Sequence, residues 1–179
     1  MAQSETCIER QKNVFSNMEF RKTLEIISNY LPEQTFKNIK DIFFKNNFPW
    51  FYVDYVSTET DKSDFLFYHF LYKDEKVCSP FFEEIVPTLI NKKIYRAKCN
   101  LYTKKDKEIH SEFHVDLPHP HKVLLYSINT NNGFTLFENG DKIPSKENQA
   151  ILFDGKIRHK SVAQTDERVR ININIDYEF

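Results

Sequence analysis

The chain has 179 residues, of which 40% are hydrophobic and 15% aromatic, so it can bury one core around a cavity. Its formal net charge of −1 provides no general attraction for a phosphate backbone, which argues against nucleic acid as a partner. The polar N-terminus lacks the apolar stretch of a signal peptide, and no apolar run approaches the roughly 20 residues of a membrane span.

The three cysteines, Cys7, Cys78 and Cys99, are odd in number, far apart and without C-x-x-C spacing. This pattern excludes a disulfide framework and fits a reducing compartment. We therefore expect a cytoplasmic protein without a membrane partner.

The first half of the chain predicts two helices and several aromatic strands. Residues 1–20 are polar and irregular, which fits a short helix or a loose arm. The helix-like periodicity that follows places Phe36, Ile39 and Phe43 on one face, next to Ile42. The second helix contains Pro87, which should kink or split it. The predicted strands lie in 23–32, 48–56 and 64–73, and the predicted helices in 33–47 and 80–93.

The second half reads as a series of short strands separated by the turn signals NNG, NGD and FDG, a pattern typical of a sandwich or barrel. The predicted strands are 94–103, 111–116, 122–129, 133–139, 150–155, 159–164 and 168–179. We expect a single α+β domain over residues 1–179. Helices and supporting strands occupy 1–93, and a double-stranded β-helix (jelly roll) occupies 94–179.

Two of these strands alternate between apolar and polar side chains. The polar members are Arg96, Lys98, Asn100 and Tyr102 in one strand, and Arg168, Arg170, Asn172 and Asn174 in the other. An antiparallel sheet with one face in water would give this pattern. A polar cavity inside the roll would give it as well, and the asparagines would then be able to contact a ligand.

His114 and Asp116 are two positions apart in a predicted strand, so both side chains project to one face and can reach one ion. His159, from a distant strand, would complete a set of two histidines and one carboxylate. Such a set suits non-heme iron(II), because three coordination positions stay open. An H-x-D motif alone is weak, and nearby histidines (His110, His119 and His121) are alternative ligands that we expect to be exposed loop residues. His69, in an aromatic strand, is expected to be packed rather than a ligand.

A cosubstrate such as 2-oxoglutarate chelates a metal at one end and needs a cation for its far carboxylate. Arginine suits this role because its planar fork matches a carboxylate. Arg168 lies nine positions after His159, on what should be the adjacent strand. Arg170 shares its predicted face and is the rival anchor.

Residues 95–177 resemble the catalytic core of 2-oxoglutarate/iron(II) oxygenases, nearest to the prolyl-4-hydroxylase-like branch and most similar to its small phage-type members. The resemblance rests on the order H-x-D, H, R and on these matching stretches: HVD (114–116) followed by Pro118, LLYSIN (124–129), NGFTLFENG (132–140) and ILFDGKIRH (151–159). FPWFY (48–52) is similar to an N-terminal segment of the phage-type members.

The resemblance implies that His114, Asp116 and His159 bind iron(II), that Arg168 anchors 2-oxoglutarate, and that Tyr102 lines the cosubstrate pocket. Ser127 departs from the pattern, since some prolyl hydroxylases have a tyrosine there that helps bind the far carboxylate.

The implied enzyme is a dioxygenase. It consumes 2-oxoglutarate and O2, releases succinate and CO2, and hydroxylates a C–H bond. The implied substrate is a peptidyl proline or another protein side chain, and alternatively a free amino acid or small metabolite. A non-catalytic metal-binding jelly roll is the rival from another class. If the chain is viral, its expected location is the host cytoplasm.

Overall fold

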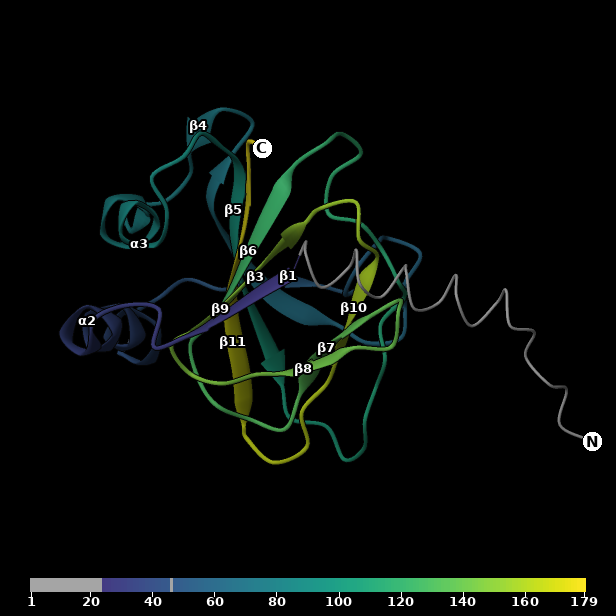
Figure 1. Ribbon diagram of the computed structural model, residues 1–179. Coiled ribbons are helices and arrows are strands. Elements are labelled where there is room, and N and C mark those ends of the chain that lie inside the picture. Colours follow the sequence, from purple (N-terminus) through teal and green to yellow (C-terminus); the bar gives the residue numbers. More distant parts are fainter. Residues whose placement is uncertain (1–23, 46) are drawn as a thin grey trace, which may run out of the picture.

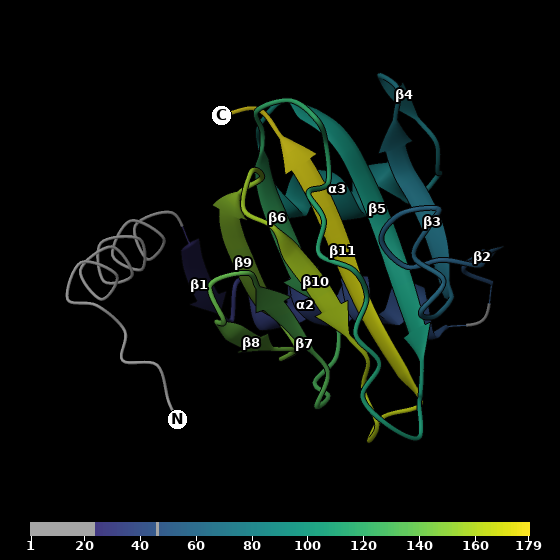
Figure 2. The same ribbon diagram turned by 90° about the vertical axis from the view of Figure 1, so that its right-hand side faces the viewer.

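The computed structural model describes residues 24–45 and 47–179, so the polar segment 1–20 lies outside the described residues. Two antiparallel sheets face each other, and two helices cover the outer face of the larger sheet (Figures 1 and 2). The fold is therefore a jelly-roll-like β structure with supporting helices, as the sequence predicts.

The larger sheet has eight strands in the order β1-β9-β6-β11-β5-β3-β2, with β4 paired to β3. Long, regularly alternating sequences form its centre, where β11 pairs with β5 on one side and β6 on the other. Its strands are β1 (Leu24–Ser28), β2 (Phe51–Val53), β3 (Leu66–Lys73), β4 (Lys76–Val77), β5 (Ile94–Thr103), β6 (Lys122–Ser127), β9 (Gln149–Asp154) and β11 (Val169–Tyr177).

The smaller sheet has the order β10-β7-β8 and lies over the middle of the larger one (Figure 2). Its strands are β7 (Phe134–Phe137), β8 (Lys142–Pro144) and β10 (His159–Val162). One apolar cluster fills part of the space between the sheets, with Phe137 and Phe153 at its centre. The remaining space between the sheets, over β5 and β11, is polar.

The helices pack against the opposite face of the larger sheet. In α2 (Glu33–Phe44), Phe36, Ile39 and Phe43 are buried, as their spacing predicts. Helix α3 (Phe82–Leu89) runs through Pro87 and ends two residues later, so it is shorter than predicted. A proline in the last turn removes one backbone hydrogen bond without interrupting a longer helix. The main apolar core lies between these helices and the sheet.

Two details differ from the sequence-based prediction. Residues 111–116 form no strand, because only His110 and His114 make isolated bridges, to Val162 and His159. A ladder needs consecutive pairs, and here the chain touches β10 at two separate points. The short strands β4 and β8 were not predicted, since two or three residues give too little alternation to detect.

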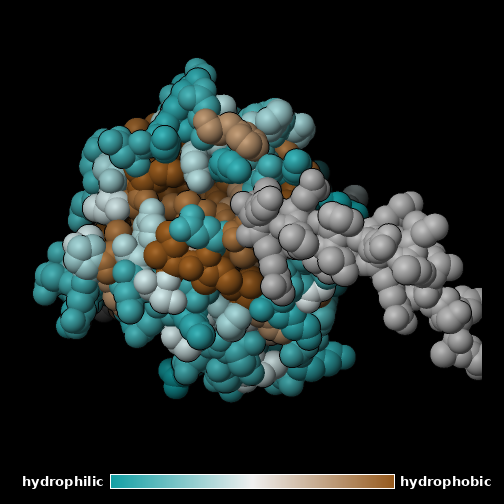
Figure 3. Space-filling view, in the orientation of Figure 1, coloured by the Kyte–Doolittle hydropathy of each residue, from teal (hydrophilic) through white to brown (hydrophobic). Residues whose placement is uncertain are grey.

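The face seen in Figure 1 has an apolar area near its middle, surrounded by hydrophilic residues (Figure 3). Ile26 of the edge strand β1 is 45% exposed. No helix in the described part of the chain is long and apolar enough to cross a membrane.

Candidate active site

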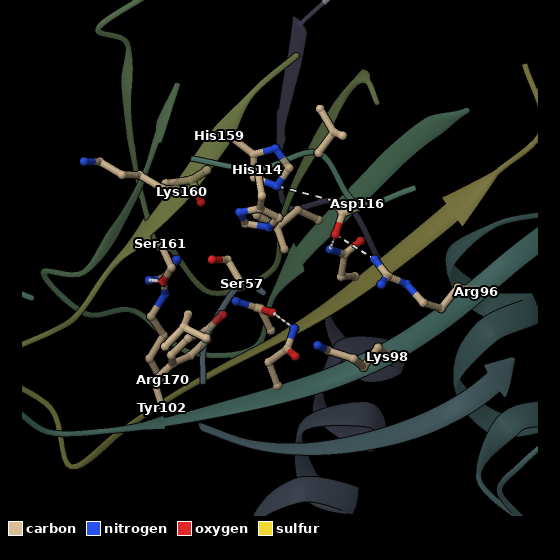
Figure 4. A pocket seen from close by; sticks show the side chains of 17 residues that line it. Ser57, Arg96, Lys98, Tyr102, His114, Asp116, His159, Lys160, Ser161 and Arg170 are labelled. Atoms are coloured by element: carbon tan, nitrogen blue, oxygen red, sulfur yellow. Dashed lines mark hydrogen bonds and ion pairs between the residues drawn. The ribbon is translucent and has the colours of Figure 1, made fainter. Parts of the chain in front are cut away.

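A polar cavity opens between the two sheets, and its floor is formed by β5 and β11 (Figure 4). Ladder partners carry side chains on the same face, so the pairs Asn100–Asn172 and Tyr102–Arg170 both contribute to it. The alternation noted in the sequence thus produces a cavity rather than a wet outer face. The floor residues are Arg96, Lys98, Asn100, Tyr102, Arg170, Asn172 and Asn174.

His114, Asp116 and His159 converge at the opposite side of this cavity. One ligand atom from each lies within 4.8 Å of the other two. The backbones of His114 and His159 exchange two hydrogen bonds of 3.0 Å, which places the loop residue beside strand β10. Convergence therefore depends on this bridge and not on the predicted strand at 111–116.

A hydrogen bond from Nδ1 to a backbone carbonyl orients each of the two imidazole rings. Nδ1 of His114 lies 3.2 Å from the Glu112 carbonyl oxygen, and Nδ1 of His159 lies 3.1 Å from that of Ile157. A carbonyl can only accept, so each Nδ1 carries a proton and, in the neutral ring, Nε2 is the atom with a free lone pair. Metal-binding histidines in proteins are held by this kind of bond.

The two carboxylate oxygens of Asp116 have different surroundings. Oδ1 accepts hydrogen bonds from Arg96 (2.6 Å) and Asn174 (3.1 Å). Oδ2 is buried without a hydrogen-bond partner and lies 3.4 Å from Nε2 of His159. Burial alone would raise the pKa of Asp116, but the neighbouring imidazoles and Arg96 outweigh it and hold that pKa well below its usual range. The group is thus an anion with one oxygen free.

The protonation of the two histidines is also compatible with metal binding. Burial lowers the pKa of His114, so its ring is neutral near pH 7. Burial would lower the pKa of His159 too, but the adjacent Asp116 carboxylate outweighs it and raises that pKa. A cation placed between them would take over the carboxylate oxygen and leave His159 neutral.

The donor set fits a divalent ion of the iron type. Two imidazole nitrogens and one carboxylate oxygen on one side of a cavity leave other positions open. Buried polar atoms without partners surround them, including Oδ1 of Asn100 and Oδ1 of Asn174. Such atoms are rare in native proteins and call for a ligand or water. The observed orientation of Asp116 Oδ2 and the two Nε2 atoms thus suits an ion held at this point.

Arg96 connects Asp116 to a second buried carboxylate, Asp176, with hydrogen bonds of 2.6 Å to each. Burial and the nearby charge of Asp116 raise the pKa of Asp176 to about 7. The buried ring of His121 lies next to Asp176, with Nε2 of the histidine 3.6 Å from Oδ1 of the aspartate. The same ring occupies the space that a Cβ on Gly155 would need. The acids also approach His121 closely enough for a metal. Because Arg96 already bonds to both carboxylates, we assign this cluster a supporting role.

We expect Arg96→Met to lower the free energy of unfolding by about 3–5 kcal/mol at pH 8, since it leaves two buried carboxylates without their shared cation. The matched control is Arg158→Met, which removes an exposed pair with Glu138 and should cost at most about 1 kcal/mol. Urea unfolding of the metal-free protein measures both. Equal losses would contradict the buried network.

The loss in Arg96→Met should be smaller at pH 5 than at pH 8. The folded-state pKa of Asp176 is about 7, above its value of about 3.9 in an unfolded chain, so the folded protein binds this proton more readily. The resulting stabilisation is complete below the unfolded pKa and is lost as the pH rises through about 7. Protonating Asp176 removes one of the two repelling charges in the variant.

Arg170 lies at the other end of the cavity floor and is 2% exposed. Its Nη1 donates to Oγ of Ser161 (2.9 Å) and to the Val162 carbonyl (3.0 Å), and its guanidinium lies 5.2 Å from the centre of the Tyr102 ring. Its Nε is buried without a partner. One edge of the guanidinium is therefore fixed by the protein, while the other can receive a carboxylate.

Arg168 does not lie in this cavity, contrary to the sequence-based preference for it over Arg170. It is exposed and borders a separate surface pocket that includes Lys40 and Glu147. The ladder of β11 begins at Val169, paired with Thr103, so Arg168 precedes the strand and strand alternation does not fix its direction. Tyr102, by contrast, lines the cavity as predicted.

The remaining histidines do not line the cavity. His110 and His119 are exposed, as expected, whereas His121 precedes strand β6 as a loop residue but is 1% exposed, so the expectation that it would be exposed is wrong. His69 is buried and packs against Phe48, with ring centroids 4.7 Å apart, as expected of a core histidine.

Sequence reasoning missed the role of Arg96 and overlooked Asp176. The signal was present, because Asp176 continues the alternation of Asn172 and Asn174, but acidic residues near a strand end are usually exposed. Ser127 is buried opposite Asn172 without lining the cavity.

Three solved structures share this fold. An oxidoreductase of the 2OG-Fe(II) oxygenase family from Burkholderia pseudomallei matches with a TM-score of 0.71 and 12% identity, over 99% of this chain and 93% of that one. A prolyl-4-hydroxylase from Pseudomonas putida matches with a TM-score of 0.56 and 8% identity, over 93% and 98%. A Trichoplax adhaerens prolyl hydroxylase, solved with a peptide of hypoxia inducible factor, matches with a TM-score of 0.52 and 18% identity, over 97% and 94%.

No family model matches the sequence, and no curated protein matches it either. At these identities the structural matches establish the fold of 2-oxoglutarate/iron(II) oxygenases and leave the activity to be argued from the site.

Proposed function

We propose that this protein is an iron(II)- and 2-oxoglutarate-dependent oxygenase that hydroxylates a C–H bond, with His114, Asp116 and His159 as the metal ligands. The observation that carries the proposal is the Asp116 oxygen without a hydrogen-bond partner, beside two imidazoles whose Nδ1 atoms are bound to backbone carbonyls, so that each Nε2 is the atom available to a metal. When bound, the iron would activate O2 in a reaction coupled to the decarboxylation of 2-oxoglutarate to succinate and CO2.

The protein's own residues would supply binding and orientation. Arg170, rather than Arg168, would hold the far carboxylate of 2-oxoglutarate, because it is buried in the cavity with one edge unbonded. Tyr102 would line that end of the pocket. Arg96 and Asn174 would hold Oδ1 of Asp116, so that only Oδ2 faces the ion.

Succinate formation tests the proposal directly. Purified protein with iron(II), 2-oxoglutarate and O2 should form succinate and consume O2 even without a primary substrate, and omission of iron or addition of a chelator should stop both. Iron binding without any succinate would instead indicate a non-catalytic metal-binding jelly roll. A substrate screen by mass spectrometry, reading for the addition of one oxygen atom, would then choose between a prolyl side chain and a small metabolite.

A further inference from the structure

Four cationic side chains line the central cavity. Three of them either bind a group of the protein or point out of the cavity, namely Arg96, Arg170 and Lys160. Arg96 bonds to two carboxylates, and Arg170 bonds to Ser161 and to a backbone carbonyl. Lys160 lies with its Nζ 4.5 Å from the centre of the Phe113 ring and points away from the cavity (Figure 4). The fourth cation, Lys98, is different.

Lys98 makes no hydrogen bond and no ion pair within the described part of the chain. Its one aromatic contact is distant, with Nζ 6.0 Å from the centre of the Tyr68 ring. Its amine points toward the interior of the cavity (Figure 4). Burial, together with the like charge of Arg96, lowers the pKa of Lys98 to about 8. A partly buried ammonium without an anion is costly, and an anion bound in the cavity would offset that cost.

The position of Lys98 separates it from the end assigned to the cosubstrate. Lys98 pairs with Asn174 in the ladder, while Tyr102 pairs with Arg170. Four residues of strand separate the two pairs, which is about 13 Å at roughly 3.3 Å per residue. Asp116 lies near the Lys98 end, where its Oδ1 accepts a hydrogen bond from Asn174, and a cosubstrate that binds the ion and Arg170 would extend from there in the direction away from Lys98 (Figure 4). A cosubstrate held by Arg170 and the ion therefore leaves the Lys98 end open.

The charges of the filled site also leave Lys98 unbalanced. A divalent ion, a doubly charged 2-oxoglutarate, Arg170 and the group of Arg96 with its two carboxylates cancel formally. Lys98 then remains as one uncompensated positive charge in the cavity. One anionic group on a molecule that binds beside 2-oxoglutarate would neutralise the charge of Lys98.

We propose that Lys98 contacts an anionic group of the primary substrate, which is therefore a small organic anion bearing a carboxylate or a phosphate. This inference rests on the proposed function, since it assumes that the ion and 2-oxoglutarate fill the rest of the cavity. It narrows the substrate to a charged metabolite or free amino acid in preference to an uncharged peptidyl proline.

Nuclear relaxation with small anions as probes tests this proposal. The protein is loaded with Mn(II), which is paramagnetic, and with saturating 2-oxoglutarate so that Arg170 is occupied. Acetate and inorganic phosphate are then titrated, and the relaxation of the acetate protons and of ³¹P reports binding near the metal. At least one of the two anions should bind, and neutral acetamide should not. The anion that responds identifies the carboxylate or phosphate chemistry.

Lys98→Met should weaken binding of that anion about tenfold or more, the loss expected for a charge-assisted hydrogen bond. Lys98→Arg should retain binding, and Lys160→Met, which removes the same charge from the same cavity lining, should not change it. Equal anion binding in wild type and Lys98→Met would overturn the inference, and so would a wild type in which neither acetate nor phosphate binds more strongly than acetamide. Failure to bind Mn(II) or 2-oxoglutarate at all would instead overturn the proposed function, and this inference with it.

Discussion

Replacing Asp116 by alanine should abolish iron binding and 2-oxoglutarate turnover together. The change removes the one anionic ligand, and its buried oxygen Oδ2 has no other partner. Loss of a residue that merely orients a ligand already weakens metal binding 10–100-fold, so loss of the ligand itself should exceed about a hundredfold. Titration of iron(II) against a chromophoric chelator measures the affinity, and succinate formation measures turnover.

His114→Ala should have the same effect, and His119→Ala provides the matched control. His119 lies five positions along the same loop, is exposed and does not line the central cavity. Its replacement should leave both iron affinity and turnover within about twofold of wild type, as for an ordinary surface change. Wild-type turnover in Asp116→Ala or His114→Ala would show that the metal is bound elsewhere.

The periodic parts of the fold were predictable because burial imposes a regular pattern on them. The apolar positions of α2 recur at helical spacing, and the isoleucines of β11 alternate with asparagines. The alternation of isoleucine and asparagine indicates that one face of β11 is polar, but it does not indicate whether that face lies against water or against a cavity. The answer depends on the smaller sheet, whose position over β6, β9 and β11 no local pattern encodes.

The candidate metal ligands were predictable from chemistry, since H-x-D and a distant histidine form a known kind of donor set. The reason for their convergence was not predictable. The sequence favoured a strand at 111–116, whereas His114 reaches His159 through one isolated bridge. Loop paths of this kind depend on tertiary contacts, which sequence periodicity does not report.

The sequence placed Arg168 on the cavity face because the start of a strand is difficult to locate from sequence. Counting back by twos from Asn172 places both Arg170 and Arg168 on the cavity face, but the ladder ends at Val169. An error of one or two residues at a boundary is common. Here that error decides whether an arginine is buried beside Tyr102 or exposed near helix α2.

Arg170→Met should raise the apparent 2-oxoglutarate constant more than about a hundredfold while iron binding stays intact. A carboxylate that loses its buried charged partner costs about 3–5 kcal/mol, and each 1.4 kcal/mol is a factor of about ten. Methionine keeps much of the volume between Tyr102 and Ser161, so the loss should reflect charge rather than a cavity. Succinate formation at varied 2-oxoglutarate, and anaerobic binding of 2-oxoglutarate to the iron-loaded protein, measure the effect.

Arg168→Met is the control that separates the two arginines, because it removes the same group from an exposed position on the same segment. It should change the 2-oxoglutarate constant less than about twofold, as expected for a solvated surface charge. Arg170→Lys should fall between wild type and Arg170→Met, since an ammonium keeps the charge but cannot match both oxygens of a carboxylate. A larger effect from Arg168→Met would return the anchor to Arg168. No effect from either methionine variant would remove 2-oxoglutarate from the site and leave only the metal.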